Sequence, residues 1–136
     1  MVEWAYPSDV HYVRPDRYYS FPDHLGLDFQ TPTGTPVYAS RTGRVTYLAD
    51  ELSGFGNVVV LTHEDGWRSL YAHLSEVFVQ RSDVVSAGYM LGRSGGMPGT
   101  PGAGASTGPH LHYQIMEPGA HNSAGTVDPL PLLEAV

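Results

Sequence analysis

Glycine and proline interrupt this chain at short intervals and limit what it can fold into. The sequence holds 16 glycines and 11 prolines among its 136 residues, and they recur along its whole length. Proline removes a backbone hydrogen-bond donor, and glycine costs about 1 kcal/mol inside a helix. Long helices are therefore excluded, and the apolar residues fall in short runs between turn signals.

Those short runs are rich in Val, Tyr, Leu and Thr, which favour β-strands. We expect strands over residues 25–29, 37–39, 44–49, 57–62, 68–73, 77–79, 90–91 and 110–116. The segment HEDG at residues 63–66 lies between two of the runs and predicts a hairpin turn. Many short strands joined by loops predict a mainly β, antiparallel domain with little helix.

The length of the chain predicts a single domain over residues 1–136. Five aromatic side chains among residues 1–20 predict an N-terminal arm that packs on the core. Residues 94–108, SGGMPGTPGAGASTG, are too rich in glycine and proline for regular structure. We therefore expect a long, flexible loop there and refer to it as the glycine-rich loop.

Composition excludes several classes of function. There is no cysteine, so disulfides, thiolate zinc sites and cysteine nucleophiles are ruled out. All seven basic residues are arginine, and a net charge of −7 argues against binding to nucleic acid or to anionic membranes. No apolar run approaches the roughly 20 residues of a membrane span, and the first residues show no signal-peptide pattern.

The first candidate site is the segment HLGLDF at residues 24–29. On a strand its leucines and phenylalanine would face the core, while His24, Gly26 and Asp28 would face the other side. Because Gly26 has no side chain, a cation could sit between the imidazole and the carboxylate, with ligand distances of about 2.0–2.2 Å. Taken alone, the segment also fits a surface hairpin with a polar outer face.

Two further segments carry histidines. In GPHLHYQI, His110 and His112 share one face of the expected strand, with Cα atoms roughly 6.5 Å apart. Two imidazoles so close would repel each other if both were charged, which favours one metal ligand and one acid or base over two ordinary exposed histidines. His73, in YAHLS, is by itself equally typical of a structural histidine bonded to backbone.

Together the segments predict more than each does alone. A hydrolytic zinc site needs three protein ligands and an open position for water. His24, Asp28 and His112 could supply the ligands. His73 and His110 would remain to transfer protons and to stabilise an oxyanion.

The ordered segments HLGLDF, YAHLS and GPHLHYQI resemble the signature of the LytM/lysostaphin-type zinc metallopeptidases, the M23 family. Segments between them, such as GTPVYA, GFGNVVV and VDPL, are similar to further landmarks of that family, and the resemblance covers about residues 24–130. It departs from the family pattern at residues 80–85, which lack a glycine, and in the length of the glycine-rich loop. The longer loop bears on substrate preference.

The resemblance implies a cradle-like antiparallel β-sheet (a cradle or sandwich) whose long loops wall a groove. It implies one Zn²⁺ ion on His24, Asp28 and His112, with catalytic roles for His73 and His110. The implied reaction is hydrolysis of peptide bonds in peptidoglycan, in the stem or the cross-bridge, by a zinc-activated water. We expect His110 to be the general base and His73 to stabilise the oxyanion or reprotonate the amine, although the two roles could be exchanged.

Two other functions remain open. The chain could be a non-catalytic M23-like module that binds peptidoglycan or activates another cell-wall hydrolase. It could also be a structural or carbohydrate-binding β domain with incidental histidines. The expected partners are peptidoglycan peptides, without nucleic acid or membrane insertion, and the expected location is extracytoplasmic: secreted, in the cell envelope or phage-borne. The sequence gives no indication of oligomeric state.

The remaining candidates are more typical of structural roles. His63 lies in the expected turn, and His11 and His121 fit surface positions. Trp4 and Trp67 could stack on a sugar, but partial burial in the core is favoured. For Tyr18 and Tyr19 we favour packing of the arm over a hydrogen bond to an oxyanion.

Overall fold

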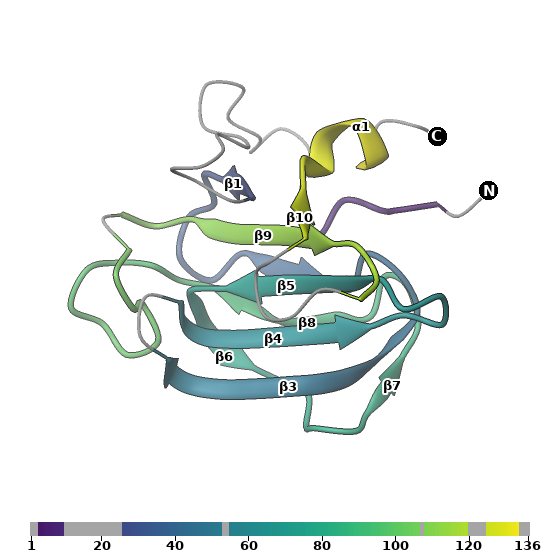
Figure 1. Cartoon of the computed structure of the whole chain (residues 1–136). Coiled ribbons are helices and arrows are strands. Elements are labelled where there is room, and N and C mark those ends of the chain that lie inside the picture. Colours follow the sequence, from purple (N-terminus) through teal and green to yellow (C-terminus); the bar gives the residue numbers. More distant parts are fainter. Residues whose placement is uncertain (1–2, 10–25, 53–54, 107, 120–124, 134–136) are drawn as a thin grey trace.

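The computed structural model describes residues 3–9, 26–52, 55–106, 108–119 and 125–133 (Figure 1). Ten short strands and one short helix follow one another along the chain. They are β1 (Leu27–Phe29), β2 (Pro36–Tyr38), β3 (Gly43–Leu52), β4 (Gly56–Thr62), β5 (Arg68–Ala72), β6 (Leu74–Val77), β7 (Val84–Val85), β8 (Met90–Ser94), β9 (Leu111–Met116), β10 (Thr126–Val127) and α1 (Pro129–Leu133).

The strands form two antiparallel sheets. Seven strands make the larger sheet, in the order β1-β9-β5-β4-β3-β7, with β10 also paired to β9. The smaller sheet has the order β2-β8-β6. Figure 1 shows β6 and β8 lying behind β4 and β5, as a second layer. This architecture confirms the mainly β, antiparallel fold that the sequence predicts.

Most expected strands are present, with shifted ends. The run expected at 77–79 forms earlier, as β6. Three elements, β7, β10 and α1, were not predicted, because they have only two to five residues and are too short to show a periodic pattern. The predicted turn at 63–66 joins β4 to β5, and Gly66 closes it with a φ of 89° and a hydrogen bond from its N–H to the His63 carbonyl at 3.0 Å.

The main hydrophobic core includes alternate residues of β9. Leu111, Tyr113 and Ile115 belong to it and are fully buried, as the alternation along that segment predicts. Phe29 of β1 packs edge-on against Tyr113, with ring centroids 6.2 Å apart. His112 and Gln114, which alternate with the core residues of β9, therefore face the opposite side of the larger sheet.

A buried polar network lies at the edge of this core. The His63 Nδ1–H donates to the Thr42 carbonyl at 2.9 Å, so Nε2 accepts from the Ser69 hydroxyl at 3.0 Å. The Ser69 hydroxyl also contacts the Tyr71 hydroxyl at 2.8 Å, and the Ser40 N–H donates to that same Tyr71 oxygen at 3.0 Å. These polar groups are thus satisfied without water, which keeps the cost of burying them low.

The described part of the N-terminal arm packs on this region. Trp4 is buried, with its ring edge-on to His63 at 5.2 Å and the Arg41 guanidinium 4.6 Å from its centroid. Trp67 is partly buried beside Trp4, at 5.9 Å. Both indoles therefore take the core positions that we favoured over sugar stacking. Residues 10–20 lie outside the described residues, and they include His11, Tyr12, Tyr18 and Tyr19.

Within the described ranges, no helix is long and apolar enough to cross a membrane. The helix α1 has five residues.

The buried imidazole of His63 makes stability depend on pH. Burial lowers the pKa of His63 below its usual 6.5, although the bond to the Thr42 carbonyl opposes this shift. The unfolded chain therefore binds a proton here more readily than the folded protein. The free energy of unfolding should be at its full value above about pH 6.5 and fall as the pH drops toward the lower folded-state pKa.

His63→Gln should flatten that part of the profile, because it removes the titrating group. Urea unfolding of the metal-free protein at intervals between about pH 8 and pH 5 measures the difference. A His63→Gln profile that ran parallel to that of the native protein would contradict the assignment.

Candidate metal and catalytic site

Strand pairing brings Asp28 and His112 together from positions 84 residues apart in the chain. In the register of β1 and β9, Asp28 lies directly opposite His112. Their side chains project from the face of the larger sheet that is turned away from the main core. The Asp28 Oδ1 and the His112 Nδ1 are 3.1 Å apart.

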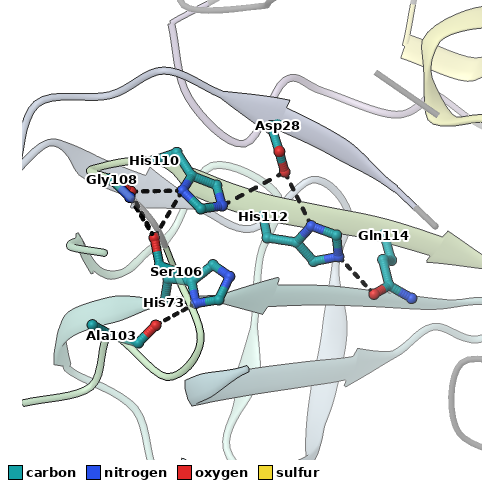
Figure 2. A network of polar contacts seen from close by, with 8 residues as sticks. All are labelled: Asp28, His73, Ala103, Ser106, Gly108, His110, His112 and Gln114. Carbon is teal, nitrogen blue, oxygen red and sulfur yellow. Dashed lines mark hydrogen bonds and ion pairs between the residues drawn. The ribbon is translucent and has the colours of Figure 1, made fainter. Parts of the chain in front are cut away.

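His110 joins this pair from just before the start of β9. It forms an isolated bridge with Gly95 and projects on the same face as His112, as the sequence predicts. Its Nε2 lies 3.8 Å from the Asp28 Oδ1. Figure 2 shows the Asp28 carboxylate facing both rings.

A turn in the backbone directs His73 to the same place. Strand β5 ends at Ala72, and His73 has a φ of 62°, in the left-handed region that non-glycine residues seldom occupy. Had β5 continued, His73 would have pointed to the core side, like Tyr71. Instead its ring centroid lies 4.6 Å from that of His110 and 6.0 Å from that of His112. The conformation costs about 1–3 kcal/mol, and such strain is commonly found at functional sites.

Four of the five predicted site residues are therefore neighbours: Asp28, His73, His110 and His112. The fifth, His24, lies outside the described residues. The four side chains are largely but not fully buried, with 16% of the Asp28 side chain exposed and 9% of the His112 side chain. This leaves limited access from solvent.

The glycine-rich loop fixes the two histidines that are predicted to transfer protons, His73 and His110. The His73 Nδ1 lies 2.7 Å from the Ala103 carbonyl, and the His110 Nδ1 lies 2.8 Å from the Gly108 carbonyl. Ser106 places its hydroxyl 3.1 Å from the same His110 nitrogen. A carbonyl only accepts, so both Nδ1 atoms carry hydrogen, and in the neutral rings Nε2 holds the unshared electron pair.

The middle of the loop is seated on the sheets. The Asn57 N–H donates to the Gly102 carbonyl, and the Asn57 side chain donates to the Leu74 carbonyl, both at 3.0 Å. Gly102 and Ala103 are buried, whereas residues 97–101 are exposed. A Cβ atom on Gly102 would lie 2.4 Å from the Leu74 oxygen, so the loop needs glycine there to sit this close. The expected flexibility stays a prediction, and it concerns chiefly the exposed tip.

The surroundings of His73 favour its neutral form. Burial, followed by the nearby His110, lowers the pKa of His73 to about 4. At neutral pH the ring is therefore uncharged, and its Nε2 is a proton acceptor.

The contacts of His112 fit a bound cation. Its Nε2 lies 2.7 Å from the Gln114 Oε1, and the amide nitrogen of Gln114 donates to the Thr126 hydroxyl at 3.0 Å. With Oε1 accepting, the hydrogen of the neutral ring is on Nε2, and the unshared pair on Nδ1 faces the Asp28 carboxylate. Two acceptors 3.1 Å apart repel each other, and either a second proton on the ring or a bound cation between them would remove this repulsion. One oxygen and one nitrogen donor suit a zinc ion.

In the part of the chain that the structure describes, no three His, Asp or Glu side chains form a complete metal site by themselves. The third predicted ligand, His24, precedes the described strand β1. The structure therefore describes two of the three predicted metal ligands, Asp28 and His112. Their chemistry is consistent with the predicted zinc site.

Several groups around the site were not predicted from the sequence. Gln114 could have been found, because strand alternation places it on the same face as His110 and His112. Phe55 lies close to the His112 ring, with centroids 5.7 Å apart, and no sequence pattern indicates this contact. The same is true of the loop carbonyls, since backbone acceptors are not visible in a sequence.

Comparison with known proteins gives a consistent result. The sequence model described as peptidase family M23 matches residues 22–129. A curated relative, the peptidoglycan DD-endopeptidase ShyA of Vibrio cholerae, is 40% identical over 93 residues, which are 68% of this chain and 20% of that protein. The chain spans about a fifth of the length of several curated relatives.

Solved structures share the fold. The antimicrobial peptidase lysostaphin from Staphylococcus simulans superposes with a TM-score of 0.81 at 32% identity, covering 99% of this chain and 55% of that one. A zinc-containing peptidase from Vibrio cholerae superposes with a TM-score of 0.72 at 27% identity, covering 99% of this chain and 40% of that one.

Substitution of Gly26 would test how closely the site is packed. It has a φ of 130°, and a Cβ atom there would lie 2.6 Å from the Tyr113 oxygen and 2.9 Å from both His112 Cε1 and Gln114 Cγ. The expectation of an open space for a cation beside Gly26 is therefore wrong, because the missing side chain makes room for the His112 ring itself. Gly26→Ala should lower the free energy of unfolding through backbone strain and also through collision.

Gly34→Ala is the matched control, because Gly34 has a φ of 94° with nothing within 4 Å of the added Cβ. It should cost about 1–2 kcal/mol from strain alone. Gly26→Ala should cost roughly 1–3 kcal/mol more, as overpacked sites do, and should weaken zinc binding. Equal losses in urea unfolding, with unchanged zinc binding, would show that Gly26 does not pack against the site.

Proposed function

The chain belongs to peptidase family M23, and on that basis we propose that it is a zinc-dependent endopeptidase that hydrolyses peptide bonds of bacterial peptidoglycan. The family's peptidases are hydrolases that act on peptide bonds. Relatives named for peptidoglycan and for zinc support the substrate and the metal.

The observation that carries the proposal is the position of the Asp28 carboxylate. Its Oδ1 lies 3.1 Å from the Nδ1 of His112 and 3.8 Å from the Nε2 of His110. One carboxylate oxygen thus lies beside both the second proposed ligand, His112, and the proposed base, His110.

We infer that His24, Asp28 and His112 hold a single zinc ion. When bound, the ion supplies a Lewis acid for the scissile carbonyl and lowers the pKa of a water molecule. Asp28 and His112 are held for this task by the pairing of β1 with β9, so little rearrangement is needed to bind the ion.

His110 is the proposed general base. Its Nδ1–H is bound to the Gly108 carbonyl, which leaves Nε2 free to accept a proton on the side of the ring nearest Asp28.

His73 is proposed to pass a proton to the leaving amine. Its ring lies beside that of His110 and is fixed by the Ala103 carbonyl. At neutral pH its Nε2 carries no proton, so His73 would first have to receive the proton that His110 takes from water. The protonated ring would then return that proton to the amine or stabilise the oxyanion, and the roles of His73 and His110 could still be exchanged.

The substrate would reach the site along a groove bordered by the glycine-rich loop. We propose that the exposed tip at residues 97–101 contacts the peptide beside the scissile bond. Since peptidoglycan lies outside the cytoplasmic membrane, we propose that the domain acts there. Peptidoglycan peptides are its proposed partners.

The direct test is digestion of purified cell walls of several cross-bridge types, followed by mass spectrometry of the released muropeptides. We expect about one zinc ion per chain, cleavage of peptide bonds, and loss of cleavage on chelation that is reversed by added zinc. Zinc-loaded protein that cleaves no wall preparation would instead favour a non-catalytic module that binds peptidoglycan or activates another hydrolase.

Substitutions should separate the ligands from the proton-transfer residues. Asp28→Ala or His112→Ala should lose zinc and activity together. His73→Ala or His110→Ala should retain zinc and lose about 10²–10⁴ in rate, as expected when a proton-transfer group is removed. Metal analysis of each purified variant and rates on a defined muropeptide measure the two effects. An empty metal site in His110→Ala would refute the ligand assignment.

A further inference from the structure

Gln114 is neither a proposed zinc ligand nor a proposed proton-transfer residue, so its burial beside the site needs another explanation. It is a polar side chain on β9, only 1% exposed, and its neighbours along the strand, Tyr113 and Ile115, belong to the main hydrophobic core. Both ends of its amide are used. The oxygen accepts from the His112 Nε2 at 2.7 Å, and the nitrogen donates to the Thr126 hydroxyl on β10 at 3.0 Å.

The orientation of this amide decides which nitrogen of His112 is available. With the oxygen toward the ring, the hydrogen is on Nε2 and the unshared pair on Nδ1 points at Asp28. With the amide reversed, its NH₂ group would donate to Nε2, and the ring hydrogen would move to Nδ1, between His112 and Asp28. The second arrangement would fill the position that a cation needs.

Strand pairing places Thr126 beside this amide. In the register of β10 and β9, Thr126 lies opposite Met116, next to Gln114 on the same face of the sheet. Its hydroxyl accepts the amide hydrogen and so anchors the side chain with its oxygen turned to the ring. Figure 2 shows the Gln114 amide at the end of the polar contacts that run from Asp28 through His112.

We propose that Gln114, oriented by Thr126, is a positioning residue that holds His112 in the tautomer whose Nδ1 binds the metal. The proposal rests on the zinc site proposed above and extends it to the second layer of contacts. An acceptor behind a ligating histidine fixes the ring and raises its basicity, and losing such a partner commonly costs 10–100-fold in metal affinity.

The experiment compares zinc affinities of the purified, metal-stripped full chain by competition with a chromophoric chelator. Gln114→Met keeps the length of the side chain but removes the acceptor, and it should weaken zinc binding by about 10–100-fold. Gln114→Glu can only accept from the ring, so it should bind zinc at least as tightly as the native chain. Thr126→Val, which leaves the amide unanchored, should weaken zinc binding by a smaller factor than Gln114→Met.

Ser69→Ala is the control for simple loss of a buried polar group, since Ser69 belongs to the polar network around His63. It should lower stability without changing zinc affinity. A second readout is the ring proton on the His112 Nε2 in zinc-loaded protein, followed by NMR. It should exchange slowly in the native chain and in Gln114→Glu, and rapidly in Gln114→Met.

Should Gln114→Met not fold, Thr126→Val and Gln114→Glu still decide the matter. Native affinity in Gln114→Met or in Thr126→Val overturns the proposal while leaving the zinc site standing. Affinity in Gln114→Glu that is as weak as in Gln114→Met also overturns it, because the acceptor would then not matter. A native chain that binds no zinc overturns this inference together with the proposed function.

Discussion

The register between β1 and β9 is the constraint on which the site depends. It places Asp28 opposite His112 and brings two electron-rich atoms within 3.1 Å of each other. A shift of one residue in either strand would turn one of these side chains into the core, because successive strand residues alternate between faces. The fully buried Leu27, Phe29, Leu111 and Tyr113 oppose such a shift, so the hydrophobic core holds the register that the proposed chemistry requires.

The glycine-rich loop has a structural role in addition to the substrate role that its length suggests. Its carbonyls fix the rings of His73 and His110, and its middle is seated on the sheets through Asn57. Glycine allows this close approach at Gly102, while the exposed tip stays clear of the sheets. One loop thus positions two proposed catalytic residues and also borders the proposed groove.

Much of the fold could be predicted from the sequence, because short alternating runs between turn residues are a strong signal for antiparallel strands. The same alternation placed His110 and His112 on one face. It could not place His73, whose ring reaches the site only because the backbone takes a positive φ after β5. Nor could it find the short strand β10 and its Thr126, the loop carbonyls or Phe55, since these depend on tertiary contacts that leave no local pattern.

The most direct test of the account is a crystal structure of the zinc-loaded protein with the metal located by anomalous scattering at the zinc edge. We predict one zinc ion about 2.0–2.2 Å from the Asp28 carboxylate and from the Nδ1 of His112, with the Gln114 oxygen against the Nε2. Zinc bound through the His112 Nε2, or located away from Asp28, would contradict the account.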